Sequence, residues 1–178
     1  MSQAMAEPNL IDLIAGINLS YEEDGREKKK TQANLLLEIA EGIPLFHNQF
    51  NDAFARITRG FHIEIIRVES SNFRDFLSLC YYELCGTAAN RASLRDAIGT
   101  LNAKARYASP KWPTFQRVAK FKGNLYIDLC DEHWRCIEIT PDGWNVIETP
   151  PYGFWFERGK NAAALPDPMR GGSVELLR

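Results

Sequence analysis

Residues 71–110, SNFRDFLSLCYYELCGTAANRASLRDAIGTLNAKARYASP, carry the clearest helical periodicity in the chain. Apolar residues recur there at spacings of three and four, which places them on one face of a helix. The first set is Phe73, Phe76, Leu77, Cys80, Tyr81 and Leu84, and the second is Leu94, Ala97, Ile98, Leu101 and Ala105. Gly86 is a helix stop, while Ser70, Ser71 or Asn72 can cap the first helix and Asn90 the second. The sequence therefore predicts two neighbouring helices joined by a short link.

Strand-like segments lie on both sides of this helix pair. Residues 61–65 alternate between apolar and polar side chains, and residues 31–40 have a helical pattern that ends at Gly42. Further along, residues 115–121 and 125–130 flank one turn, and residues 134–140 and 144–148 flank another turn with the sequence Pro-Asp-Gly. We therefore expect an α+β fold, in which an antiparallel strand meander accompanies a packed helix pair and an N-terminal helix.

Composition divides the chain into three parts. Residues 1–30 read as a flexible or partly helical leader, with a short amphipathic helix within residues 9–19 and a solvated charge run at residues 21–30. Residues 31–158 are expected to form a single α+β domain, with a turn at residues 48–52. Residues 159–178 are rich in glycine and proline and read as a C-terminal linker or tail.

Length and charge narrow the class of protein. The chain has 178 residues, of which 45% are hydrophobic and 25% charged, and its formal net charge is −2. That composition is ordinary for a globular protein and argues against a nucleic-acid coat protein. No apolar run approaches the ~20 residues that span a bilayer, and no secretory signal pattern is seen, so we expect a cytoplasmic chain without a membrane partner.

Three sets of residues are candidates for catalytic or metal-binding motifs. The segment from Gly153 to Asn161 resembles a P-loop, but its spacer is one residue too long and the hydroxyl residue is missing. The four cysteines, Cys80, Cys85, Cys130 and Cys136, have spacings that fit zinc poorly and favour reduced thiols. The carboxylates Asp128, Asp131 and Glu132, with Glu138 on the next strand, read as solvated turn acids. We therefore expect no enzyme, cofactor or metal, and keep a nuclease site assembled from distant residues as an alternative.

The basic residues are distributed unevenly along the chain. Residues 91–122 contain eight Lys or Arg and one acid, whereas residues 128–148 contain six acids and one Arg. Cations interleaved with aromatic rings, here Tyr107, Trp112, Phe115 and Phe121, are typical of nucleic-acid surfaces, because cations neutralise phosphates and rings stack on bases. The predicted contacts are Arg91, Arg95, Lys104, Arg106, Lys111, Arg117, Lys120 and Lys122, with Trp112 as a stacking platform. The alternative is a solvated helix face followed by a loop.

Aromatic residues near the C-terminus suggest a second class of function. Large apolar side chains seldom stay exposed, so an aromatic patch at the surface favours docking to a partner or to a second copy. The residues concerned are Trp144, Tyr152, Phe154, Trp155 and Phe156. In this alternative the chain is a protein-interaction or oligomerisation module, and the sequence leaves its oligomeric state open.

Several segments together resemble one region of a known group of proteins. The most specific part of the resemblance is residues 125–138 with Gly143 and Trp144. The full set of segments that carry it is residues 31–36, 45–47, 73–77, 81–82, 101–105, 117–119, 125–131, 134–139, 143–144 and 170–173. The chain from about residue 31 to 178 is similar to the segment upstream of the ATPase in primase-helicase replication proteins of phages, plasmids and integrated elements. It departs from that pattern around residues 48–59.

The resemblance implies a role beside a motor. It implies a non-enzymatic accessory domain of mobile-element DNA replication, with DNA as one partner. The second implied partner is an AAA+-type replicative ATPase, encoded in the same frame or an adjacent one. Motor activity itself is not implied for this chain, because its sequence holds no complete P-loop.

Overall fold

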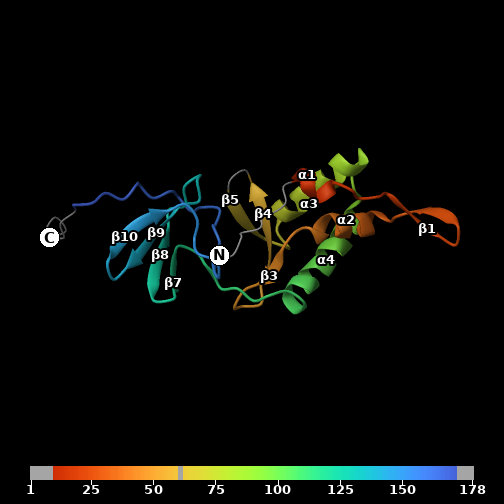
Figure 1. The fold of residues 1–178 in the computed structure, drawn as a ribbon. Coiled ribbons are helices and arrows are strands. Elements are labelled where there is room, and N and C mark those ends of the chain that lie inside the picture. The colour runs from red at the N-terminus through yellow and green to blue at the C-terminus, as the bar shows by residue number, and fades with distance from the viewer. Residues whose placement is uncertain (1–9, 60–61, 172–178) are drawn as a thin grey trace. The chain divides into compact units, whose positions relative to one another are not determined.

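The fold is α+β, as the sequence predicts, and its helices are followed by an antiparallel meander (Figure 1). The computed structural model describes residues 10–59 and 62–171. The chain divides into two compact units, Met1–Thr114 (unit 1) and Phe115–Arg178 (unit 2), and the boundary falls inside the range 31–158 that we expected to form one domain. None of the helices in the described residues combines the length and apolar character needed to cross a bilayer.

Three capped helices organise unit 1: α2 (Gln32–Glu41), α3 (Ser71–Cys85) and α4 (Arg91–Tyr107). The side chains of Thr31, Ser70 and Asn90 each accept a hydrogen bond from the backbone N–H three residues later. These bonds satisfy amide groups that have no partner inside the helix. At its other end α3 stops at Gly86, whose φ is +67°. The predicted helix pair and its boundaries are therefore confirmed.

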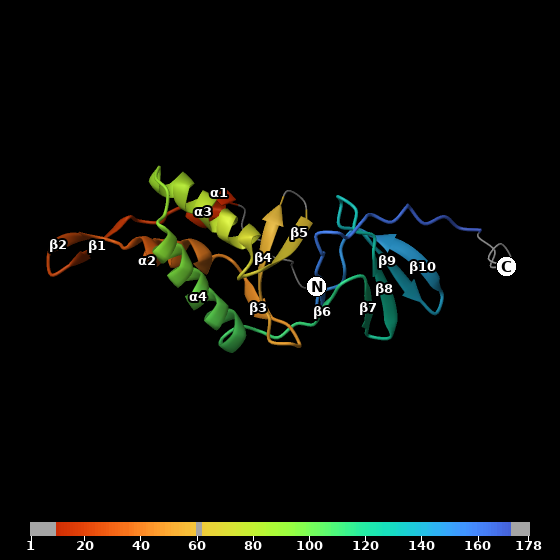
Figure 2. The ribbon, with the colours of Figure 1, turned by 180° about the vertical axis from the view of Figure 1, so that it is seen from behind.

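A three-stranded antiparallel sheet completes this unit, in the order β3 (Leu45–His47), β4 (Ala53–Arg59), β5 (His62–Arg67). The turn predicted between the first two strands is built around Asn48, which is 1% exposed. The Asn48 side-chain oxygen accepts from the N–H groups of Phe50 and Asp52, both at 2.9 Å. In Figure 2 the sheet lies at one end of the helices.

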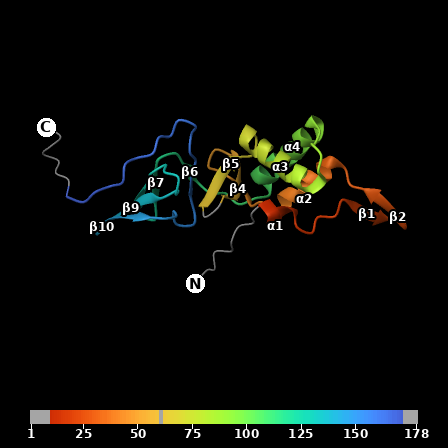
Figure 3. The same ribbon diagram turned by 90° about the horizontal axis from the view of Figure 1, so that it is seen from above.

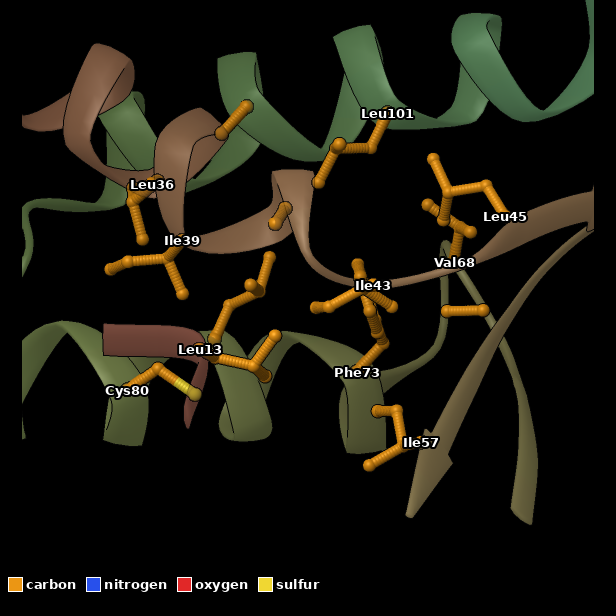
Figure 4. Packing of buried hydrophobic residues seen from close by; sticks show 14 of the residues in the cluster. Leu13, Leu36, Ile39, Ile43, Leu45, Ile57, Val68, Phe73, Cys80 and Leu101 are labelled. Atoms are coloured by element: carbon orange, nitrogen blue, oxygen red, sulfur yellow. The ribbon is translucent and has the colours of Figure 1, made fainter. Parts of the chain in front are cut away.

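The core of unit 1 lies between the helices and this sheet (Figure 4). Leu36 and Ile39 reach it from α2, Phe73 from α3 and Leu101 from α4, and each is 2% exposed or less. The short helix α1 (Leu10–Ile14) adds Leu13, which is 7% exposed. Part of the region that we expected to be a leader therefore belongs to the core.

The charge run at residues 21–30 contributes a β-hairpin, β1 (Ser20–Glu23) and β2 (Arg26–Lys29). Its turn residues Asp24 and Gly25 have φ of +52° and +69°, the backbone that a two-residue hairpin turn requires. Every side chain from residue 21 to 29 is exposed. Figure 3 shows the hairpin extending from the helices on the side away from the sheet. The run is solvated, as predicted, but it has regular structure.

Unit 2 is a four-stranded antiparallel meander with neighbouring strands in chain order. The strands are β7 (Val118–Phe121), β8 (Asn124–Asp128), β9 (Cys136–Thr140) and β10 (Gly143–Ile147). Both predicted hairpins are therefore confirmed. Two short strands, β6 (Thr114–Phe115) and β11 (Trp155–Phe156), pair at the start of the unit, where the Phe115 carbonyl accepts from the N–H of Glu157 at 2.7 Å.

The aromatic C-terminal segment packs onto one face of this meander. The Phe154 ring centroid lies 5.1–5.8 Å from those of Phe115, Phe121, Tyr126 and Phe156. Ala119, Tyr126 and Cys136 supply the sheet side of this cluster. The segment is therefore the core of unit 2.

The predicted aromatic interaction surface is wrong for three of its five residues. Phe154, Trp155 and Phe156 are 1%, 7% and 4% exposed, so a partner cannot reach them. Tyr152 is exposed and Trp144 is half-buried. The error has a physical cause, because an apolar segment in a chain of this length can bury itself against the chain's own sheet.

The last described residues follow the sheet of unit 2 and were expected to be a linker or tail. They contain no helix or strand up to residue 171. The N–H of Leu165 donates to the Leu129 carbonyl at 2.8 Å, and Asp167 lies 2.7 Å from the Arg135 guanidinium. The tail is therefore anchored along its described part.

Gly153→Ala should destabilise the protein by about 2 kcal/mol, because the new methyl overpacks the core and the backbone there disfavours a side chain. Gly153 has φ of +129°, and a Cβ at this position would meet the Phe121 ring at 2.6 Å. Urea unfolding measures the change. Gly159→Ala is the matched control, since a Cβ there meets nothing within 4 Å. Equal stability of the two variants would contradict this account.

Candidate nucleic-acid interface

Helix α4 carries the first four of the predicted DNA contacts. Leu94, Ala97, Leu101 and Ala105 form its buried stripe, so its remaining sides face solvent or neighbouring polar groups. Arg91, Arg95 and Lys104 are exposed, whereas Arg106 is half-buried. Figure 2 shows the course of α4 across unit 1.

The exposed cations of α4 do not form one stripe. Arg91 and Arg95 are four residues apart and share a side of the helix. Lys104 is nine residues beyond Arg95, and at 100° per residue this spacing corresponds to a rotation of about 180°. Arg95 and Lys104 therefore leave the helix on opposite sides, which corrects the expectation of a single basic surface.

Most of these cations have little competition from protein carboxylates. Arg95 lies 3.5 Å from Asp96, but both side chains are more than 60% exposed, and such pairs contribute little. Within the described residues, the side chains of Arg91, Lys104 and Lys111 have no carboxylate within 4.0 Å. These cations are therefore available to phosphate groups.

Arg106 belongs to a polar cluster that faces the sheet side of α4. Its guanidinium lies 3.9 Å from Glu69, and the Asn102 amide donates to the same carboxylate at 2.7 Å. Asp52 and Arg67, which are 3.1 Å apart, line the same cavity of about 180 Å³. The charges of the two acids in this cavity balance those of its two arginines, so the cavity has no electrostatic preference for phosphate.

Trp112 is held by neighbours within unit 1. Its ring centroid lies 5.3 Å from that of Phe46, and the Arg56 guanidinium lies 5.0 Å from the Trp112 ring. The backbone N–H of Trp112 donates to the His47 carbonyl at 3.0 Å. Its ring is half-buried. A base stacking on the ring face beneath Arg56 would have to displace that side chain, and the role of Trp112 as a platform stays a prediction.

Tyr107, one of the four rings interleaved with the cations in the sequence, is the more accessible ring, although it was not among the predicted contacts. It is the last residue of α4 and is 83% exposed. It lies three residues after Lys104, so the two side chains leave the same side of the helix. The sequence feature that indicates an exposed Tyr107 is its position outside the apolar stripe, at the end of the helix. Lys104 and Tyr107, together with Lys111 four residues further along the chain, are called the lysine–tyrosine end of α4.

The remaining three predicted contacts lie in unit 2. Arg117 donates to the backbone carbonyls of Asp128 and Ala163, at 3.4 and 3.0 Å, and so holds the tail. Lys120 is exposed on β7, and the Lys122 amine lies 5.2 Å from the Phe121 ring centroid in the following turn. The predicted stretch is thus shared between units that are separate compact bodies.

The carboxylates that could build a nuclease site are engaged with other partners. Asp128 is 1% exposed, and the Arg158 guanidinium donates to its two oxygens at 2.6 and 2.9 Å. Arg158 also donates to the Asp131 carbonyl at 2.5 Å and lies 3.9 Å from the centroid of the Trp134 ring. The expectation of a solvated turn acid is therefore wrong for Asp128. Within the described residues, no three His, Cys, Asp or Glu side chains gather as a metal site.

Two cysteines beside this ion pair are poor nucleophiles. Burial raises the pKa of the Cys130 thiol to about 11, and the hydrogen bond to Asp128 and the negative charge of Asp128 act in the same direction. Burial, with the charges of Asp128 and Glu138, raises the pKa of the Cys136 thiol to about 12. Because the thiolate is the reactive form, both groups stay protonated and inert near neutral pH.

Asp128→Ala should destabilise the protein by about 3–5 kcal/mol, because it leaves the Arg158 charge buried without its partner. The Arg158 side chain is only 14% exposed. Glu132→Ala is the control, since the Glu132 side chain is 87% exposed. Denaturant unfolding at neutral pH compares the two. An effect of Asp128→Ala no larger than that of the control would overturn the assignment.

Asp131 should make stability depend on pH. Burial alone would raise its pKa, but two hydrogen bonds from Arg135 and the charges of Arg135 and Arg158 lower it below its ordinary value. A lowered pKa in the folded state stabilises the fold above the unfolded pKa, about 3.9, and this stabilisation is lost as pH falls through the folded pKa.

The matching experiment compares wild type with Asp131→Asn. The variant should be less stable near pH 6, and the difference should disappear as the pH falls below about 3.9. Thermal unfolding across this range measures both. A difference for Asp131→Asn that stays constant down to low pH would contradict the pKa assignment.

Comparisons of the chain with family models, with curated proteins and with solved structures give no match. The resemblance to primase-helicase replication proteins therefore stays a prediction from the residues. A function has to be argued from the exposed groups of the two units.

Proposed function

We propose that the chain is a non-enzymatic accessory domain of a mobile-element DNA replication protein and that it contacts single-stranded DNA through the lysine–tyrosine end of α4. The observation that supports this most is the combination at that end of two exposed lysines with a ring that is 83% exposed. Lysines neutralise phosphates and rings stack on unpaired bases. The resemblance to primase-helicase replication proteins supplies the replication context.

Single-stranded DNA is favoured over a duplex by the chemistry of this end. A stacked duplex does not offer the faces of its bases to a tyrosine, whereas a single strand does. Arg91 and Arg95 lie at the other end of α4, on the opposite side from Lys104, and would contact a separate stretch of backbone. Contacts of this kind give weak, salt-sensitive and sequence-tolerant binding.

The remaining parts of the proposal follow from the resemblance. An accessory domain of this kind acts in the cytoplasm beside an AAA+-type ATPase, which supplies the motor activity. The departure of residues 153–161 from a P-loop supports a role without ATP hydrolysis in this chain. Burial of Phe154, Trp155 and Phe156 next to Gly153 supports it further, because a P-loop needs open backbone amides.

Binding to a labelled oligothymidine should be measurable by fluorescence anisotropy at about 50 mM salt, with a Kd of roughly 1–100 μM. Lys104→Ala with Lys111→Ala should weaken binding and make the slope of log K against log salt shallower by about 1.4, because two phosphate contacts are lost. Tyr107→Ala should weaken binding to the single strand while leaving the salt slope unchanged, because stacking releases no counterions.

The matched control is Lys28→Ala with Lys29→Ala, which removes the same charge from the exposed hairpin of unit 1. This variant should bind as wild type does. Equal loss in both double variants would show that net charge alone drives binding. Absence of any binding by the wild-type chain would reject the proposed function.

A further inference from the structure

The meander of unit 2 has two different faces. One carries Ala119, Tyr126 and Cys136 and is covered by the aromatic segment at residues 154–156. Successive side chains of a strand point to opposite faces, so the intervening residues form a second face. Strand register, rather than sequence distance, decides which residues meet on it.

On this second face the register aligns two rows across all four strands. The first row is Val118, Ile127, Ile137 and Val146, and the second is Lys120, Leu125, Ile139 and Trp144. Seven of the eight positions are therefore apolar. We call these eight residues the two-row face.

The two-row face is not part of a core. Val118 and Leu125 are 54% and 42% exposed, and the other five apolar residues are half-buried. Among the described residues, none of the eight belongs to either cluster of buried apolar side chains or to the side chains packed against them. A continuous apolar face of this kind is typical of a surface that binds another protein.

Cations lie at both ends of the second row. Lys120 is exposed at the β7 end. At the β10 end the Arg170 guanidinium lies 5.1 Å from the Trp144 ring centroid and donates to the Trp144 carbonyl at 3.1 Å. Neither row contains an acid, and the nearest acids along β10, Asp142 and Glu148, lie beyond the ends of that strand. The face therefore favours an acidic partner.

We propose that the two-row face binds an amphipathic α-helix of a partner protein, whose apolar stripe covers the two rows and whose flanking Asp or Glu residues pair with Lys120 and Arg170. The size of the two-row face matches that of a helix. Four strands about 4.8 Å apart and two rows about 7 Å apart make a patch of roughly 14 by 7 Å between Cα positions. A helix about 10 Å wide covers such a patch with about three turns.

Charge distinguishes this occupant from a second copy of the chain. A symmetric dimer places the same patch on both sides of the interface. Each copy would then bring a cation at both ends of the second row toward a face that has no acid, and like charges facing each other oppose association. Acidic flanks on a foreign helix remove that repulsion.

The test uses the full chain and two synthetic helical peptides of about 18 residues. Both carry leucines at positions i, i+3, i+4 and i+7, and their flanking positions are Glu in one peptide and Lys in the other. Anisotropy of the labelled peptides should show saturable binding of the Glu peptide. The Lys peptide should bind at least roughly tenfold more weakly, because the face is flanked by cations.

Val118→Glu and Leu125→Glu should each weaken binding of the Glu peptide by at least roughly tenfold, because they place a carboxylate within the apolar patch. Both positions are already exposed, and circular dichroism checks that the variants fold. The matched control is Leu79→Glu on α3, at a position that is 48% exposed in unit 1, and its binding should equal that of wild type.

Three results would overturn the proposal. The first is absence of saturable binding of the Glu peptide, and the second is equal binding of the two peptides. The third is a dimer of the wild-type chain in light scattering that Leu125→Glu converts to a monomer, which would identify a second copy as the occupant. Single-stranded DNA binding depends on unit 1, so its success or failure leaves this test unaffected.

Discussion

The ion pair between Asp128 and Arg158 fixes how unit 2 is built. These residues are thirty positions apart, and their two hydrogen bonds join the end of β8 to the residues just after β11. Arg158 is further held by the Trp134 ring and by the Asp131 carbonyl. A buried carboxylate is tolerated only with such a partner, so the chain that carries Arg158 must return to the meander.

That return decides which aromatic residues are available for binding. Arg158 follows the aromatic segment directly, and once it is fixed, Phe154 and Phe156 lie over Ala119, Tyr126 and Cys136. One face of the sheet is then filled. The other face, on which Val118 and Leu125 are 54% and 42% exposed, is not part of that cluster. The surface suited to a partner is therefore aliphatic and lies on the sheet, not on the aromatic segment.

The elements of this fold could be predicted because their signals are local. Helix stripes, the caps Ser70 and Asn90, and the turns at residues 122–124 and 141–143 each depend on residues close together in the sequence. The α+β class follows from them. Placement of the aromatic segment depends on a pair thirty residues apart, and nothing in either local pattern indicates that Asp128 would be buried.

The candidate nucleic-acid interface could likewise be predicted only in part from the sequence. The count of charges along residues 91–122 is correct, but it does not say toward which side of the fold each charged side chain points. The helix rotates Lys104 away from Arg95, the Glu69 and Asn102 side chains occupy the surroundings of Arg106, and the unit boundary separates Arg117 from α4. Rotation about the helix axis, which the residue spacing does imply, places Lys104 on the side of Tyr107 and not on that of Arg95.

The division into two units gives the two proposed surfaces different physical characters. Binding at the lysine–tyrosine end of α4 depends on exposed charges in water, so salt weakens it strongly. Binding at the two-row face depends mainly on removing apolar area from water, and salt affects only the contribution of Lys120 and Arg170. If both surfaces act as proposed, the chain holds a protein partner under conditions in which its hold on DNA is weak. That separation suits an accessory domain that stays with a motor while the motor moves along a strand.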